Sequence, residues 1–258
     1  LAAAVDAISE RLLAGGRLFY LGAGTSGRLG VLDAAECPPT FCSDPELVQG
    51  VLAGGTPALL RSSEGLEDLE QAGREDLERH GFQQGDCLVG IAAGGTTPYV
   101  RGGLSYARSI GALAIGMACV PKDQAPLPCD IDIRLLTGPE LLTGSTRLKA
   151  GTATKMALNI LSTTVMVRLG KVYGNRMVDV AASNSKLVDR SLRILRDLIG
   201  VEREEGLALL ALSDGSVKLA LLMKAANLSK DQARSVLERH DQQLRPSLET
   251  CGATLAQL

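Results

Sequence analysis

Two short glycine segments with neighbouring hydroxyl side chains are the parts of this sequence best suited to chemistry. The first, YLGAGTSGRLG at residues 20–30, contains the pattern G-x-G-x-x-G and places Thr25 and Ser26 between Gly24 and Gly27. Backbone N–H groups at a helix start, together with hydroxyl donors, suit the oxygens of a phosphate monoester. We therefore expect this segment to bind phosphate, although such hydroxyls also serve as simple helix caps.

A dinucleotide site is less well supported than a site for a smaller phosphate. A dinucleotide turn needs an acidic side chain at the end of the second strand, about 20 residues further on, to bind the ribose hydroxyls. The second predicted strand, residues 47–53, is followed by Gly54 and Gly55, and Glu64 comes too late. The glycine pattern therefore lacks its usual acidic partner.

Two further segments repeat the arrangement of glycines, hydroxyls and a helix start. One follows the apolar run at residues 87–93 and consists of Gly94, Gly95, Thr96 and Thr97. The other, LTGSTRLKAGT at residues 142–152, contains Ser145 and opens a long predicted helix with Arg147 and Lys149 in its first turn. Helix openings of one parallel domain meet at the carboxyl edge of its sheet, where ligands bind. The sequence thus predicts a phosphorylated small molecule as ligand, with three independent caps as the alternative.

The elements that must position these segments alternate between helix and strand. We expect strands at residues 17–21, 47–53, 87–93, 112–120 and 131–136, and helices at residues 2–13, 27–36, 67–80, 99–110 and 146–169, with Pro38-Pro39 stopping the second helix. Strands separated by helices predict an α/β fold, a doubly wound parallel sheet covered on both faces.

The last part of the chain is predicted to be wholly helical. Helices are expected at residues 184–199, 202–212, 215–226 and 229–243, and Ser229 with Gln232 fits a capping box. We expect two domains, a ligand-binding domain at residues 1–180 and a C-terminal helical subdomain at residues 181–258. Packing against the main domain is the ordinary role of such a tail, and a partner-binding module is the alternative.

Composition excludes several classes of protein. The net charge is −2, no stretch gathers Lys and Arg, and aromatic residues make up 3% with no Trp, so no nucleic-acid surface is expected. No apolar run reaches about 18 residues, so no membrane span is expected.

Six cysteines without a C-x-x-C pair indicate buried thiols in a reducing cytoplasm, and two histidines leave no zinc ligand set. The chain starts at Leu1 inside a helical pattern, and we expect an upstream segment to be missing.

Longer motifs resemble one family. LGAGTSGRLGVLDAAECPPT at residues 21–40 is similar to the signature of N-acetylmuramic acid 6-phosphate etherases, sugar-isomerase-type (SIS) domain proteins that also resemble the glucokinase regulatory protein. Further matches follow in order along the chain: AGG (53–55), EGLED (64–68), GIAA (90–93), TPY (97–99), LTGSTRLKAGTATK (142–155), KVYGN (171–175), MVD (177–179) and NSKL (184–187).

The resemblance implies a reaction of amino-sugar metabolism in peptidoglycan recycling. The C3 ether of N-acetylmuramic acid 6-phosphate is cleaved to N-acetylglucosamine 6-phosphate and D-lactate, by elimination and then hydration, without a cofactor or metal. It further implies a cytoplasmic homodimer, phosphate binding by the three segments described above, and Lys149 as the basic ligand in the third.

Two glutamates are implied as the catalytic pair. Glu36 in AECPPT matches the family's acid/base group at the leaving oxygen, and apolar neighbours would favour its protonated form. Glu67 in EGLED is assigned to the C2 proton, although by itself it reads as an acid at the start of a charged helix. The second glycine segment departs from the family pattern ASGRTP, since Gly94 replaces a serine and Thr96 an arginine.

Two alternatives from other classes remain. One is a non-catalytic sugar-phosphate sensor like the regulatory protein, and the other is an aldose–ketose phosphate isomerase on the same fold. Release of D-lactate distinguishes the etherase from both.

Overall fold

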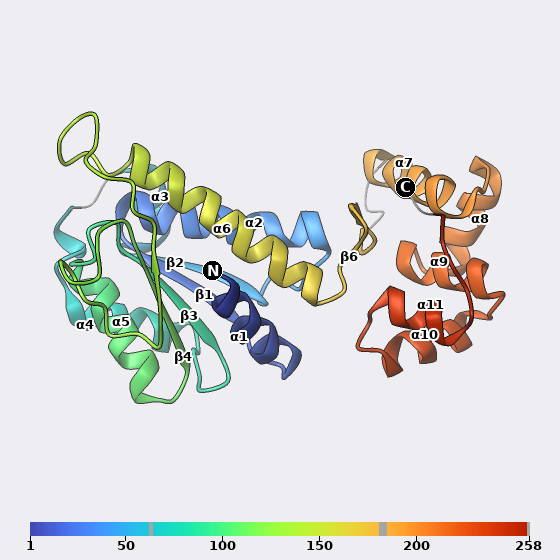
Figure 1. Cartoon of the computed structure of the whole chain (residues 1–258), viewed down its shortest axis with the longest axis horizontal. Coiled ribbons are helices and arrows are strands. Elements are labelled where there is room, and N and C mark those ends of the chain that lie inside the picture. Colours follow the sequence, from blue (N-terminus) through green and yellow to red (C-terminus); the bar gives the residue numbers. More distant parts are fainter. Residues whose placement is uncertain (62–63, 181–184, 257–258) are drawn as a thin grey trace. The chain divides into compact units, whose positions relative to one another are not determined.

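The computed structural model describes residues 1–61, 64–180 and 185–256 (Figure 1). The chain divides into two compact units, residues 1–38 with 44–165 and residues 39–43 with 166–258. The boundary predicted after residue 180 adjoins residues 181–184, which lie outside the described part, as does Asn184 of the NSKL motif. That boundary stays a prediction.

The first unit is built on a five-stranded parallel sheet. Its strands are β1 (Leu18–Gly22), β2 (Val48–Leu52), β3 (Cys87–Ile91), β4 (Leu113–Ala118) and β5 (Ile131–Arg134), in the order β2-β1-β3-β4-β5. Every residue of β1 and β3 is buried, as expected of central strands in a parallel sheet with both faces covered. Gly22 pairs with both Leu52 and Ile91, so these three strands end at the same level.

Helices cover both faces of this sheet, which confirms the doubly wound fold. Helices α4 (Glu70–Arg79) and α5 (Pro98–Ser109) pack on the face that carries Phe19, Leu21 and Leu88. Helices α1 (Ala2–Leu13), α2 (Gly24–Phe41) and α6 (Lys149–Arg168) belong to the other face (Figure 1). Alternation along β1 directs Tyr20 to that second face, where its hydroxyl reaches α2.

Helix α2 is longer than predicted and contains both prolines. It begins at Gly24, before the expected residue 27, and continues through Pro38 and Pro39 to Phe41. A proline inside a helix removes the hydrogen bond to the carbonyl four residues earlier. Here the loss is confined to the last turns, so the helix continues past the expected stop.

Residue Glu67 lies in a turn, whereas the sequence predicted that it begins a helix. The segment after β2 forms a short helix α3 (Gly55–Leu60) and a 3-10 turn η1 (Glu64–Leu66), and α4 begins only at Glu70. The Tyr99 amide donates to the Glu67 carbonyl oxygen at 3.0 Å. This carbonyl group therefore bonds to α5, whereas in a helix that began at Glu67 it would accept from an amide of the following turn.

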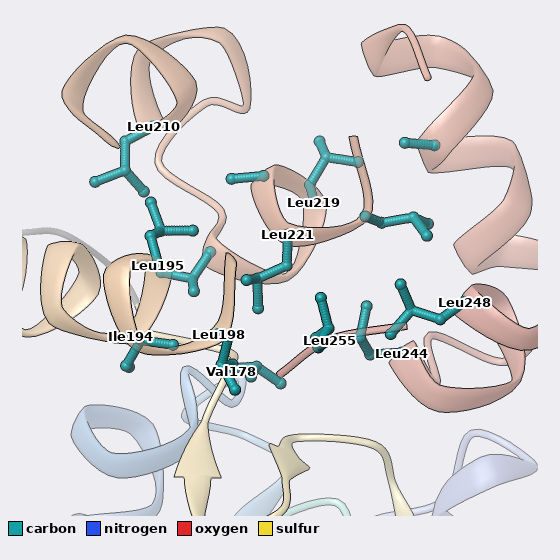
Figure 2. Packing of buried hydrophobic residues seen from close by; sticks show 14 of the residues in the cluster. Val178, Ile194, Leu195, Leu198, Leu210, Leu219, Leu221, Leu244, Leu248 and Leu255 are labelled. Carbon is teal, nitrogen blue, oxygen red and sulfur yellow. The ribbon is translucent and has the colours of Figure 1, made fainter. Parts of the chain in front are cut away.

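The second unit is helical apart from one hairpin. It contains α7 (Ser185–Ile199), α8 (Arg203–Leu212), α9 (Val217–Ala226), α10 (Lys230–Arg239) and α11 (Leu244–Thr250), preceded by the paired strands β6 (Val172–Tyr173) and β7 (Arg176–Met177). Figure 2 shows its own core of Leu, Ile and Val side chains, among them Leu195, Leu221 and Leu248. The Ser229–Gln232 capping box is confirmed, whereas α11 and the hairpin were not predicted.

Within the described residues, no helix alone has the length and apolar character to cross a bilayer. Helices α8 and α9 meet that requirement only as a pair, and they are bent by 107° at the break between them.

Candidate functional site

The strand order places the two main glycine segments at the site where open α/β sheets bind ligands. In the order β2-β1-β3-β4-β5 the connections reverse direction between β1 and β3, and the crevice at the carboxyl ends of those strands is the usual ligand site. The segment with Thr25 and Ser26 follows β1, and the segment with Thr96 and Thr97 follows β3. The two segments predicted to bind phosphate therefore flank one crevice.

The first segment is shaped by close packing of its glycines. A Cβ on Gly22 would lie 2.6 Å from the Gly27 nitrogen, and a Cβ on Gly27 would lie 2.4 Å from the Gly22 oxygen. Only glycines permit this tight strand-to-helix turn, which leaves the first N–H groups of α2 without intrahelical partners. Within the described residues, the hydroxyls of Thr25 and Ser26 accept or donate no hydrogen bond, so they remain free for a ligand.

The second segment has the same character and lies beside Glu67. Thr97 is the N-cap residue of α5, but its hydroxyl makes no capping hydrogen bond. The backbone bond from Tyr99 to Glu67 places this glutamate next to the start of α5, and its side chain is exposed. The structure therefore brings Glu67 to the segment of Gly94, Gly95, Thr96 and Thr97.

The third segment joins the other two, but a carboxylate already occupies its helix start. A Cβ on Gly151 would lie 3.5 Å from Thr25 Cγ2, so the first turn of α6 packs on the first segment. The Glu140 carboxylate accepts hydrogen bonds from the amides of Lys149 and Ala150, both at 2.9 Å. These bonds, that from Ala150 foremost, lower the pKa of Glu140.

The two basic side chains of the third segment differ in what they contact. Lys149 Nζ donates to the Thr137 carbonyl oxygen at 2.8 Å, and Arg147 is exposed. Ser145 is half-buried, and within the described residues its hydroxyl has no partner. Sequence analysis missed Glu140, because nothing in the local pattern shows that a residue nine positions upstream caps α6.

Glu36 lies well away from the first glycine segment, where α2 begins. It is twelve residues beyond Gly24 on one continuous helix, an axial distance of about 18 Å. An open-chain hexose phosphate does not span that distance from its phosphorus to its C3 oxygen. The Glu36 side chain is also exposed, not enclosed by apolar neighbours as expected. In a single chain, Glu36 is therefore farther from the start of α2 than one such substrate reaches.

One turn before Glu36, a buried carboxylate links α2 to β1 and α6. Asp33 is 6% exposed and accepts hydrogen bonds from Tyr20 Oη at 3.0 Å, Asn159 Nδ2 at 2.9 Å and Ser162 Oγ at 3.2 Å. Sequence analysis missed this residue, because an aspartate among alanines on a helix gives no sign of distant partners. The bonds hold the helix that carries Glu36 against α6.

The cysteines do not supply a nucleophile at this site. All six are free, and burial raises the pKa of the Cys37 thiol to about 12, with the carboxylates of Asp33 and Glu36 adding to the effect. Cys37 is therefore a neutral thiol that packs as a small apolar group. Within the described residues, no group of three His, Cys, Asp or Glu side chains is placed to hold a metal ion.

A cavity of about 380 Å³ lies beside the edge strand β2. Its charged groups already bind one another, since Asp76 accepts hydrogen bonds from Arg79 at 2.5 Å and from Tyr99 Oη at 2.7 Å. It contains none of the predicted site residues, and the crevice between β1 and β3 remains the better candidate.

The fold and the paired glycine segments define a SIS domain. The family model "Glucokinase regulatory protein N-terminal SIS domain" matches residues 1–108. A phosphoheptose isomerase from Francisella tularensis has a similar structure, with a TM-score of 0.50 and 16% identity over 64% of this chain and 84% of that one. This likeness concerns the fold alone.

Much more similar relatives identify the family. An N-acetylmuramic acid 6-phosphate etherase of Synechococcus sp. (strain CC9902) is 96% identical over 258 residues, which are 100% of this chain and 82% of the relative. One of Prochlorococcus marinus (strain MIT 9303) is 73% identical over 249 residues, 96% of this chain and 79% of the relative. The chain belongs to the N-acetylmuramic acid 6-phosphate etherase family.

Proposed function

We propose that this protein cleaves the lactyl ether of N-acetylmuramic acid 6-phosphate, acting as a carbon–oxygen lyase in cell-wall amino-sugar recycling. The observation that carries the proposal is the pair of glycine segments with free hydroxyls on either side of the β1–β3 crevice, in a chain of this family. A sugar phosphate is a metabolite of the cytoplasm, and six free cysteines suit that reducing compartment.

Phosphate binding is assigned to the segments at the helix starts. The donors are the amides of Gly24 and Gly94 together with the hydroxyls of Thr25, Ser26, Thr96, Thr97 and Ser145. Gly27 and Gly95 shape the two segments, because their own amides donate to the carbonyl oxygens of Ala23 and Ala92. Together they fix the phosphate end of the open-chain sugar, so that C2 and C3 extend away from the crevice toward the carboxylates. Lys149 adds its charge if its ammonium leaves the Thr137 carbonyl oxygen. Orientation of this kind supplies a large part of the rate enhancement.

The chemistry needs one base and one acid. The C1 aldehyde acidifies the C2 proton, Glu67 removes that proton, and the C3–O bond breaks as Glu36 protonates the departing lactate oxygen. Glu36 is then a carboxylate and takes a proton from water as the water oxygen adds to C3. The proton on Glu67 returns to C2, which completes N-acetylglucosamine 6-phosphate.

We propose further that the active protein is a homodimer in which Glu36 acts on the substrate held by the other copy. The separation of about 18 Å along α2 supports such an arrangement, because one helix cannot present both its start and Glu36 to one sugar. Helix α6 carries exposed apolar side chains at Met156 and Ile160, four residues apart and hence on one face, and Leu32 is exposed on α2. These side chains are suited to burial against a second copy.

Release of D-lactate from N-acetylmuramic acid 6-phosphate tests the reaction. We expect turnover by the parent protein, and a loss of about 10²–10⁴-fold in Glu36→Gln and in Glu67→Gln, since each removes an acid/base group. Binding of the sugar phosphate, measured by calorimetry, should persist in both variants. Binding without any lactate release by the parent would instead support the regulatory sensor, to which the match over residues 1–108 also points.

A mixed dimer tests the shared site. Coexpression of Glu36→Gln and Glu67→Gln chains with different tags yields dimers in which one of two sites contains both glutamates, so about half of the parental rate is expected. If both glutamates act within one chain, the mixed dimer is inactive. The control pairs the Glu36→Gln chain with the double variant, which has no complete site under either arrangement.

A further inference from the structure

A second cavity lies wholly within the helical unit, and the proposed reaction does not use it. It has a volume of about 360 Å³ and is lined by the turn of the β6–β7 hairpin, one residue of α7, part of α11 and residues 253–256. This volume is in the usual range for small-molecule sites. Its floor is apolar, because Leu198, Leu248 and Leu255 are almost completely buried side chains of the core shown in Figure 2.

The wall of this cavity contains an exposed guanidinium group that stacks on an aromatic ring and makes no hydrogen bond to any of the described residues. Arg245 Cζ lies 4.9 Å from the centre of the Tyr173 ring, a cation–π contact. Among the described residues, no acceptor lies within hydrogen-bond or ion-pair distance of this guanidinium. The stack on Tyr173 therefore orients a planar set of N–H donors and leaves them free to bind a carboxylate.

A carboxylate of opposite charge stands on the same wall without binding this arginine. Glu249 follows Arg245 by four residues on α11 and lines the same cavity. Side chains at this spacing are close enough to pair, although the order with the acid second is the less favourable one. The contact with Tyr173 holds Arg245 instead, so a cation and an anion stand side by side above an apolar floor. Asn175 and Thr254 add neutral polar groups at the rim.

We infer that this cavity binds a free α-amino acid with an apolar side chain. The ligand's carboxylate binds Arg245, its ammonium binds Glu249, and its side chain lies on Leu198, Leu248 and Leu255. A ligand that carries a carboxylate and an ammonium group close together binds Arg245 and Glu249 at the same time. A phosphate ester that binds Arg245 would instead place its negative charge beside Glu249. The site is independent of the proposed sugar-phosphate site, since its lining residues all belong to the second unit.

Binding of L-leucine to the full chain, observed by saturation-transfer NMR and quantified by calorimetry, tests this site. L-leucinamide lacks the carboxylate and N-acetyl-L-leucine lacks the ammonium, and each is expected to bind about tenfold or more weakly than leucine, because each loses one charged hydrogen-bonding group. Arg245→Met should weaken the binding of L-leucine by a similar factor and abolish the preference for leucine over leucinamide. Glu249→Gln should abolish the preference over the N-acetyl derivative.

Matched controls separate this effect from a loss of structure. Glu238 and Arg239 are exposed on α10 and do not line the cavity, so Glu238→Gln and Arg239→Met should bind leucine like the parent. Circular dichroism melting checks that all variants fold. The inference is overturned if leucine does not bind, if the two derivatives bind as well as leucine, or if the Arg245 and Glu249 variants keep the parental preferences.

Discussion

At the scale of single residues, the candidate site depends on hydroxyl groups without hydrogen-bond partners in the described part of the chain and on one carboxylate, Asp33, that accepts three hydrogen bonds. The hydroxyls of Thr25, Ser26 and Thr97 are free of internal hydrogen bonds in the described part of the chain, as a ligand site requires. Asp33 has the opposite role, since three donors from β1 and α6 converge on it. We propose that the free donors bind substrate, and the satisfied ones hold together the helices that present them.

Gly94→Ser is expected to strengthen phosphate binding. A Cβ at this position meets nothing closer than Thr96 Oγ1 at 3.7 Å, so the serine fits and adds a hydroxyl donor to the second segment. The KM for N-acetylmuramic acid 6-phosphate should fall by up to about tenfold with kcat little changed, since the new bond acts on substrate and transition state alike. Gly95→Ser is the control: its Cβ would lie 2.8 Å from Ala125 Cβ at a φ of +71°, and activity should fall. An unchanged KM in Gly94→Ser would contradict the assignment of this segment.

Asp33→Ala should destabilise the first unit. Removal of the carboxylate leaves the buried donors of Tyr20 and Ser162, and the half-buried Asn159, without an acceptor, at a cost of about 1–3 kcal/mol or more in the free energy of unfolding. Asp33→Asn keeps one acceptor oxygen and should lose less. Urea unfolding followed by circular dichroism measures both, with the exposed Asp123→Ala as control. Equal midpoints for Asp33→Ala and Asp123→Ala would show that the bonds contribute little.

At the scale of elements, α6 begins at a carboxylate supplied by its own chain. Glu140 takes the two amides that an anionic ligand would otherwise find at the start of α6, and Lys149 is turned to Thr137. Anions are favoured at this end of a helix, so an internal one competes with a ligand for the same groups. The third segment thus differs from the first two, because no carboxylate of the described residues caps the helix starts of those two.

The Glu140 cap makes the start of α6 sensitive to acid. Because the folded pKa of Glu140 is lowered from the ordinary value of 4.5, the cap contributes fully above that value and is lost as pH falls through the folded pKa. The hydrogen-exchange protection of the Lys149 and Ala150 amides should therefore fall as the pH is lowered from 4.5 through the folded pKa of Glu140. Glu140→Ala removes both acceptor oxygens and should have low protection at every pH, and retained protection in this variant would show that another group caps the helix.

At the scale of the whole molecule, Glu36 lies about 18 Å along α2 from the glycine segment that we propose to bind phosphate. One chain supplies a phosphate site and Glu67 together, and it supplies Glu36 elsewhere. A second copy is the simplest source of the missing carboxylate, and exposed apolar side chains on α6 are suited to meet it. The distance along α2 and these exposed side chains both support the proposed dimer.

Ile160→Asp should separate the copies. Ile160 is 49% exposed on α6, so the charge is tolerated in a single chain but is costly in an apolar interface. Light scattering should show a monomer, and D-lactate release should fall by the same order as in Glu36→Gln. Leu207→Asp is the control, because Leu207 is 43% exposed on α8 in the second unit. A dimer that survives Ile160→Asp would place the interface on another face.

The sequence by itself determined the class of fold, the three glycine and hydroxyl segments and the capping box at Ser229. These features are local: strand and helix periodicities, turn glycines and caps act over a few residues, so they can be read without knowing what lies opposite. The motif at residues 21–40 likewise indicated the family without any structure.

Only the tertiary structure decided which distant residues meet. The convergence of Asn159 and Ser162 on Asp33, the capping of α6 by Glu140 and the placement of Glu67 beside α5 all join parts of the chain far apart in sequence. The continuation of α2 through Pro38 and Pro39 also overrode a local stop signal and set the distance to Glu36. Local propensities are worth up to about 1 kcal/mol per residue, or about 3 kcal/mol for a proline inside a helix, and burial and hydrogen bonds between elements together outweigh them.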